Sequence, residues 1–434
     1  MIGPISTSQA PPLRLPGRYM ALGIVVLLLS GSLLPFLPAL GGPGFYSPDV
    51  LAFVHLNTLG VVGAVILGAN FQLVPVVLGR PLAAQRAALL SFWTYLPGAL
   101  LLATGLATIE EPLLAAGAVL LGLAVLTYVW VIVGTFLRAS RRDGVVWHIL
   151  LAAVNCGLGY LLGLTLALNK GEGFLGPMTL RTLGAHATVM LAGWVALMFM
   201  GVAYRLVGMF TLSEDRIVPR LVWAELVLVE VGTWAVASAA LLGSRPVGGV
   251  GALLLLMGSL LFLAHLLWLY RGRRRRRFDI HIPFALTAAV CEVGAASALL
   301  YGIARPADAL ALWTLAAWLA LFGMAETAIQ GFLYKILTFL VWLHRYAPFA
   351  GRGRVPRLEE MYDVRLGVAG WVAWTLGLLG ASVVVAGGWS AMWLPGLLMM
   401  LGVDCFLINA ASIGSHALRR VAPLGDGRSM LHRR

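Results

Sequence analysis

The sequence predicts an all-α integral membrane protein with twelve transmembrane helices in three pseudo-symmetric groups of four. Of the 434 residues, 60% are hydrophobic and only 11% are charged, and the mean hydropathy is +0.91. Such values lie outside the range of soluble globular domains. Long apolar runs recur along the whole chain, and a short glycine–aromatic motif recurs three times within them.

Twelve apolar runs are long enough to cross a membrane, because about 30 Å of hydrocarbon requires about 20 helical residues. They lie at 19–40, 51–79, 87–108, 113–139, 145–169, 183–210, 221–243, 247–270, 283–304, 309–343, 368–388 and 392–417. No soluble domain interrupts them. We therefore expect a cytoplasmic leader at 1–18, a single twelve-helix membrane domain at 19–417 and a basic cytoplasmic tail at 418–434.

The basic residues predict the orientation of these runs, since Lys and Arg near span ends stay on the cytoplasmic side. With the N-terminus inside, only Lys170, Arg181, Arg245 and Arg305 of the 31 basic residues fall outside. This asymmetry predicts a multi-pass protein of the cytoplasmic (inner) membrane with both termini in the cytoplasm. Orientation also accounts for the net charge of +13 and for the basic run at 271–277, so we expect membrane lipid as a partner and no nucleic acid.

A motif of glycine, aromatic, polar and aliphatic residues recurs in the second, sixth and tenth runs. Its first three members are Gly68, Phe71 and Gln72, then Gly201, Tyr204 and Arg205, then Gly331, Tyr334 and Lys335. The offsets between the glycines are 133 and 130 residues, a period of four helices, which indicates one structural unit used three times. Transporters built from two six-helix halves have the same number of spans, but this period argues against that architecture.

Five carboxylates lie within predicted spans, where an ionised group costs several kcal/mol and usually faces the bundle interior. They are Glu225, Glu230, Glu292, Glu326 and Asp404. Each marks a proton or ion route, or is protonated or satisfied by a neighbouring helix. Glu326 stands out because it lies near the centre of a run that carries the repeated motif.

Two histidines, His55 and His186, lie near the outer ends of the second and sixth runs. Asp49 precedes His55 by six residues, and Arg181 precedes His186 by five. Both runs pass from outside to inside, so we expect the two imidazoles at nearly the same depth. Imidazole in an apolar wall is a natural axial ligand for haem iron. The pair would provide two ligands of one haem or one ligand to each of two metal centres, and the alternative is two structural histidines.

With these features the chain resembles subunit I of the haem-copper oxidase superfamily, which has twelve spans in three four-helix arcs. That family carries its metal ligands on helices that correspond to runs 2, 6, 7 and 10. The segment HLN at 55–57 is similar to its second helix, whose histidine binds the low-spin haem. The segment HAT at 186–188, followed by GW at 193–194, resembles the His-x-His…Gly-Trp motif that cbb-type oxidases carry on the tenth helix. The run PVVLGRPL after span 2 also resembles NnrS-type proteins, short members of the same wider group that are linked with nitric oxide.

The sequence also departs from the pattern of that family. Thr188 stands where the cbb-type motif has its second histidine, and the seventh run has no histidine pair for copper. The tenth run has Ala316 and Trp318 at the positions equivalent by the repeat. The resemblance therefore implies a haem-binding protein without a complete haem-copper centre, and it leaves copper open.

From the resemblance we expect haem b bound by His55 and His186, and a role in respiratory electron transfer or in oxygen or nitric oxide chemistry. A cytochrome c or cupredoxin-type subunit is the expected partner. A polar path from the haem level to the cytoplasm is predicted at Glu326, Lys335, Arg205, Gln72 and Asn57. For Gln72, Arg205 and Lys335 the alternative is that they reach the inner surface at their helix ends. The rival function is a haem-free permease, or a membrane protein that responds to nitric oxide, redox state or metals, on the same fold.

Overall fold

The computed structural model describes residues 11–37, 43–139, 142–351 and 355–419. Within them the chain is all-helical, and twelve helices are long and apolar enough to cross a membrane. The twelve predicted spans are therefore confirmed, with ends that differ by a few residues. The predicted leader at 1–18 and tail at 418–434 lie largely outside the described residues; the first helix already begins at Arg14.

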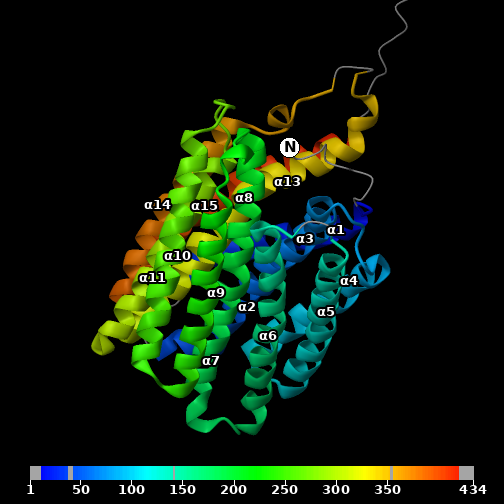
Figure 1. The fold of residues 1–434 in the computed structure, drawn as a ribbon. Helices are drawn as coiled ribbons and strands as arrows, with labels where there is room; N and C mark the ends of the chain where they lie inside the picture. The colour runs from blue at the N-terminus through cyan, green and yellow to red at the C-terminus, as the bar shows by residue number, and fades with distance from the viewer. Residues whose placement is uncertain (1–10, 38–42, 140–141, 352–354, 420–434) are drawn as a thin grey trace, which may run out of the picture.

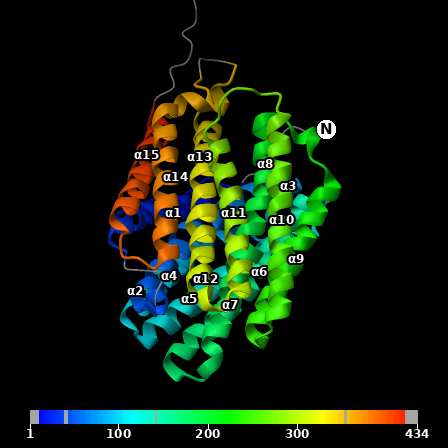
Figure 2. The ribbon, with the colours of Figure 1, turned by 90° about the vertical axis from the view of Figure 1, so that its left-hand side faces the viewer.

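Nine of the spans in the described residues are continuous α-helices. These are α1 (Arg14–Leu33), α4 (Gln85–Thr108), α5 (Glu111–Leu137), α6 (Gly144–Glu172), α9 (Pro219–Leu242), α10 (Arg245–Arg271), α11 (His281–Ala304), α14 (Val364–Gly387) and α15 (Trp393–Leu418). The helices pack side by side in one bundle (Figures 1 and 2). Successive spans run in opposite directions, as in the α4–α5 hairpin, where a Cβ on Gly98 would meet Leu121 and one on Gly105 would meet Leu114.

The remaining three spans contain a π-helical segment between two α-helical parts. They are α2 (Pro48–His55), η4 (Leu56–Gly63) and α3 (Ala64–Leu78); α7 (Thr179–Thr188), η6 (Val189–Ala196) and α8 (Leu197–Thr211); and α12 (Ala309–Trp318), η9 (Leu319–Glu326) and α13 (Thr327–Arg345). We call these the central helices. The three π segments each have eight residues, and their first residues are 133 and 130 apart, which are the offsets of the sequence motif. π segments are rare and are frequent at functional sites.

The motif glycines allow each central helix to touch the helix that precedes it. A Cβ on Gly68 would lie 2.7 Å from the Cβ of Tyr19 on α1, and one on Gly201 would lie 2.8 Å from the Cβ of His148 on α6. A Cβ on Gly331 would overlap with Phe284 of α11. Eight residues before each motif glycine, another glycine lies in the π segment and contacts the same neighbouring helix. The pairs are Gly60 with Val26, Gly193 with Asn155, and Gly323 with Cys291. In all three groups the two glycines are 8 residues apart and their two partners on the neighbouring helix are 7 residues apart.

The motif aromatics also make matching contacts, now with the last helix of each group of four. The ring centroids lie 5.9 Å apart for Phe71 and Tyr128, 5.4 Å for Tyr204 and Phe262, and 5.3 Å for Tyr334 and Phe406. Further along each of these last helices, seven residues on in α5 and three in α10 and α15, a side chain accepts a backbone N–H from the loop before the third helix of its group. These pairs are Thr135 with Ala83, His265 with Val218, and Asn409 with Asp363.

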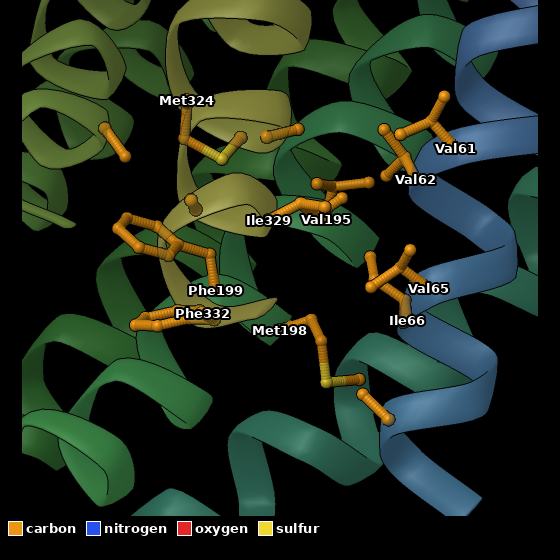
Figure 3. Packing of buried hydrophobic residues seen from close by; sticks show 14 of the residues in the cluster. Val61, Val62, Val65, Ile66, Val195, Met198, Phe199, Met324, Ile329 and Phe332 are labelled. Carbon is orange, nitrogen blue, oxygen red and sulfur yellow. The ribbon is translucent and has the colours of Figure 1, made fainter. Parts of the chain in front are cut away.

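The three central helices pack on one another at the middle of the bundle. Figure 3 shows apolar side chains of the three central helices in one cluster, and Ile66, Phe199 and Ile329 in it are at positions that the offsets of 133 and 130 relate. Phe199 lies 6.1 Å from Phe332 between ring centroids, and Phe53 stacks on Phe322 at 6.0 Å. The buried core of the described residues is thus centred on the repeated spans.

The bundle has two distinct ends. The central helices begin at the end that we call the histidine end, because His55 and His186 lie near it. They finish at the end where α1 begins and α15 finishes, at the top of Figure 1. We call this second end the basic end, since the arginine run at 271–277 lies there. The predicted placement of this end in the cytoplasm stays a prediction.

Candidate functional site between the central helices

The two predicted haem ligands occupy matching places. His55 is the eighth residue of the span that starts at Pro48, and His186 is the eighth residue of α7, which starts at Thr179. At 1.5 Å per residue, each Cα lies about 10 Å along its helix from the histidine end. The eighth residue of α12 is Ala316, so the third central helix has no histidine at this level.

Each imidazole is fixed by one backbone hydrogen bond. The Nδ1 of His55 lies 2.8 Å from the carbonyl oxygen of Leu51, and the Nδ1 of His186 lies 2.9 Å from that of Gly159 on α6. A carbonyl oxygen only accepts, so Nδ1 carries the proton in both rings. Nε2 then has a free lone pair, and neither Nε2 has a hydrogen-bond partner among the described residues.

Both histidines are partly exposed. A Cβ on Gly163 would come within 2.8 Å of Cε1 of His186, so this glycine makes room for the ring. The register of the two histidines against the π segments differs, because His55 directly precedes η4 and His186 lies three residues before η6.

No group of three or more His, Cys, Asp or Glu side chains in the described parts of the chain is arranged to hold a metal ion. The donor set at this level is therefore the two imidazoles alone. Two imidazole nitrogens with the same tautomer are donors of the type that could hold a haem iron, and they are too few for a four-ligand site of the zinc type.

Three members of the predicted polar path are buried inside the bundle with unsatisfied atoms. Glu326 ends the π segment η9, and its Oε1 has no hydrogen-bond partner among the described residues. Both polar atoms of Gln72 and the Oδ1 of Asn57 are in the same situation, although the Nδ2 of Asn57 donates to the carbonyl of Phe53 at 2.8 Å. Gln330, which the sequence analysis did not select, follows Glu326 by one helical turn and is fully buried without partners. Orphaned polar groups of this kind call for internal water or a ligand.

Arg205 and Lys335, the other two members, each pair with an aspartate near the basic end. Arg205 Nη2 lies 2.8 Å from Asp143 Oδ2, and the arginine side chain is 24% exposed. The Lys335 ammonium contacts Asp279, and this lysine is buried. The two cations therefore do not meet each other. Arg205 reaches the bundle end, as the alternative interpretation expects, whereas Lys335 stays inside.

Asp279 lies in the loop between α10 and α11 and joins two partners. Its Oδ1 is 2.7 Å from Nδ1 of His281, and its Oδ2 contacts Lys335. Burial alone would raise the pKa of this carboxyl, but the hydrogen bond and charge of His281, followed by the charge of Lys335, outweigh it and lower the pKa to about 2. Asp279 is therefore ionised at neutral pH.

The structure also brings together four polar side chains, of which the sequence pointed only to Glu225, as a carboxylate within a span, and to Tyr204, as a motif member. Nε2 of His148 lies 3.1 Å from Oε1 of Glu225, and the Tyr204 hydroxyl donates to Oε2 of Glu225 at 2.9 Å. The hydroxyl of Tyr204 in turn lies 3.2 Å from Nδ1 of His265. We call this set the His148 network. It joins α6, α8, α9 and α10 near the basic end, with His148 and Glu225 fully buried.

A smaller set supports the π segment η6. Asn155 donates from Nδ2 to the carbonyl of Gly193 at 2.9 Å and to Oε2 of Glu230 at 2.8 Å. Trp234 donates to the other oxygen of Glu230 at 3.0 Å. Glu230, a predicted route marker, is thus satisfied by Asn155 of the neighbouring helix α6 and by Trp234 of its own helix α9.

The chain matches no protein-family model and no curated protein.

Proposed function

We propose that this chain is a haem-binding membrane protein of the haem-copper oxidase subunit I type, in which His55 and His186 would hold a b-type haem. The observation that carries the proposal is the matched pair of imidazoles. Each lies eight residues into a central helix, donates Nδ1–H to a backbone carbonyl and keeps the Nε2 lone pair free. A second-shell acceptor on the other ring nitrogen is the usual arrangement for a metal-ligating histidine.

The three-times repeated contacts support the same superfamily. Superfamily resemblance implies three arcs of four helices with ligands on helices 2, 6, 7 and 10, and the central helices here are spans 2, 6 and 10. The departures remain: Thr188 follows the second histidine and Ala316 stands at the matching level of α12. These departures are the reason for proposing a bis-histidine haem without a complete haem-copper centre.

The bound haem would supply one-electron chemistry for respiratory electron transfer or for reactions with oxygen or nitric oxide. The residues of this chain would position the two histidine ligands. The carbonyls of Leu51 and Gly159 hold the ring planes and tautomers, and Gly163 leaves space beside the second ring. We further propose that the basic end faces the cytoplasm of an inner membrane, because most of the basic residues lie there.

Proton supply to this level is proposed to run along α13. Glu326 and Gln330 lie on one face of the helix, one turn apart, and both have unsatisfied polar atoms. Lys335 follows about 13 Å from Glu326 at 1.5 Å per residue and reaches Asp279 at the basic end. Gln72 and Asn57 would line the neighbouring central helix. Arg205 is paired at the bundle end and would act there as a fixed charge.

The test is a reduced-minus-oxidised visible spectrum of the purified protein, with a pyridine haemochrome assay and copper analysis on the same sample. We expect a b-type spectrum that His55→Ala and His186→Ala each abolish. His344→Ala is the matched control, since the Nδ1 of His344 also bonds the carbonyl four residues earlier, at 2.9 Å, but lies at the other end of the bundle. Its spectrum should stay unchanged.

Two other results would redirect the proposal. A well-folded wild type without haem would refute it and favour the haem-free permease or response protein. Loss of the spectrum in the His344 variant as well would mean that folding, and not ligation, limits haem content. Co-purification with a cytochrome c or cupredoxin-type subunit would place the chain in electron transfer.

A further inference from the structure

The basic end contains a pocket of about 550 Å³ between the loop that follows α10 and the loop that follows α13. Its walls carry an unusual concentration of cations. The lining residues are Arg275, Arg276, Arg277, Lys335, Arg357, Leu358 and Glu359. A volume of this size is within the range of small-molecule sites, about 300–1,000 Å³.

The charges in this pocket do not cancel. Arg275 and Arg277 both approach Glu359, the second at 4.0 Å, and Lys335 contacts Asp279 behind the wall. Five cations thus face two carboxylates, which leaves three positive charges. Neither Arg276 nor Arg357 pairs with a carboxylate anywhere in the described residues. Orientation in the membrane explains basic residues in a loop, but it does not explain why they converge on a concave site.

The floor of the pocket separates it from an ordinary solvated surface. Lys335 is the only lining side chain that comes from a membrane span, and it is 2% exposed. Its ammonium lies 5.0 Å from the ring centroid of Phe210. The pocket therefore combines exposed guanidinium groups at its mouth with a fixed ammonium at its base. Planar guanidinium groups bind phosphate oxygens through paired N–H donors, and lysine adds a point charge.

We propose that this pocket binds a phosphate-bearing anion, with Arg276 and Arg357 as the primary ligands and Lys335 at its base. The shared chemistry is a phosphate group with one or more negative charges, which belongs either to a soluble phosphate compound or to the headgroup of an anionic lipid. The inference does not depend on haem. An anion in this place would contact α13, the helix that follows Glu326 in the chain.

The experiment uses the full-length protein and two probes. Isothermal titration with inorganic pyrophosphate in neutral detergent measures the soluble source. Native mass spectrometry after reconstitution with phosphatidylcholine, with and without phosphatidylglycerol, measures retained anionic lipid. The test variant is Arg276→Gln with Arg357→Gln, which leaves Lys335 and its partner intact. The matched control is Arg271→Gln with Arg274→Gln, which removes the same charge outside the pocket; Arg274 pairs with Asp215.

We expect the test variant to lose affinity for one of the probes by at least about tenfold, the size of one charge-assisted contact, while the control pair loses less than about threefold. Loss of pyrophosphate binding identifies a soluble ligand, and loss of phosphatidylglycerol retention identifies a lipid headgroup. A third variant with lysine at both positions keeps the charge and should recover only part of the affinity. Equal losses in test and control variants, or no binding of either probe to the wild type, would overturn the proposal.

Discussion

The buried contact between His148 and Glu225 offers the sharpest energetic test of this fold. The two side chains have no exposed surface, and Nε2 and Oε1 are 3.1 Å apart. With both groups ionised, two unit charges at this distance interact by about 5 kcal/mol at an effective dielectric constant of about 20. When one partner is removed, the other stays buried without a hydrogen-bond partner and out of reach of water. We therefore expect each single substitution to lower the free energy of unfolding by about 3–5 kcal/mol.

The substitutions follow the repeats themselves. Phenylalanine occupies the place of His148 in the third group, where Phe284 meets Gly331, so His148→Phe should be tolerated sterically. Glu225→Leu removes the carboxyl group at similar volume. We expect the double variant to be destabilised less than the sum of the singles by about 2 kcal/mol or more, because removing both partners leaves fewer groups unpaired.

The assay is reversible unfolding in mixed detergent and SDS micelles, followed by circular dichroism. Arg205→Gln and Asp143→Asn form the control cycle, since this pair joins α8 to the N-cap residue of α6 but is 24% and 51% exposed. Its coupling should stay below about 1 kcal/mol. Additivity of the His148 and Glu225 substitutions within about 0.5 kcal/mol would refute the reasoning.

Three further outcomes are expected. Gly331→Ala should destabilise the fold by about 1–3 kcal/mol, because the new Cβ would overlap with Phe284. Gly414 has open space around it, so Gly414→Ala should change stability by less than about 1 kcal/mol. Equal effects of the two substitutions in the same unfolding assay would contradict the close approach of Gly331 to Phe284. The lowered pKa of Asp279 means that its charge stabilises the fold above pH 3.8 and that this contribution is lost as the pH falls through 2. Asp279→Asn should therefore be less stable than the wild type by about 2 kcal/mol at neutral pH, with a gap that closes on acidification; a gap independent of pH would show that the charge is not involved. Glu326→Gln should slow turnover with oxygen or nitric oxide and leave the haem content intact, and an unchanged rate would remove Glu326 from the proton path.

Hydropathy predicted most of the fold. All twelve spans were placed within a few residues, because each must supply about 20 apolar residues in one stretch. The start of α1 was missed, since Arg14 and Arg18 precede the apolar run although the helix includes them. The π segments were also not foreseen. A π turn differs from an α turn by one residue, and apolar runs carry no pattern that distinguishes the two.

The candidate site was only partly predictable for a related reason. Matching depth of His55 and His186 followed from counting residues after the helix start, which is local information. The His148 network joins four helices whose members are up to 117 residues apart in the chain, and no local spacing records which helix faces which. Lys335 and Asp279 were likewise separated by 56 positions, so the burial of the lysine could not be decided before the fold was known.

The repeats suggest where chemistry has been added to a common scaffold. At the level of the motif glycines, the preceding helix offers Tyr19, His148 and Phe284 in turn, and all three meet the glycine in the same way. The contact itself needs only a side chain of about that size, so packing does not require the polar, titratable imidazole of His148. The same comparison applies to the last position of the π segments, which is Gly63, Ala196 and Glu326. Two of the three repeats fill this place with a small residue, so the buried carboxyl group of Glu326 is not needed for the helix to form or to pack. The best candidates for function are therefore the positions at which one repeat has a buried polar group and the other two repeats have none.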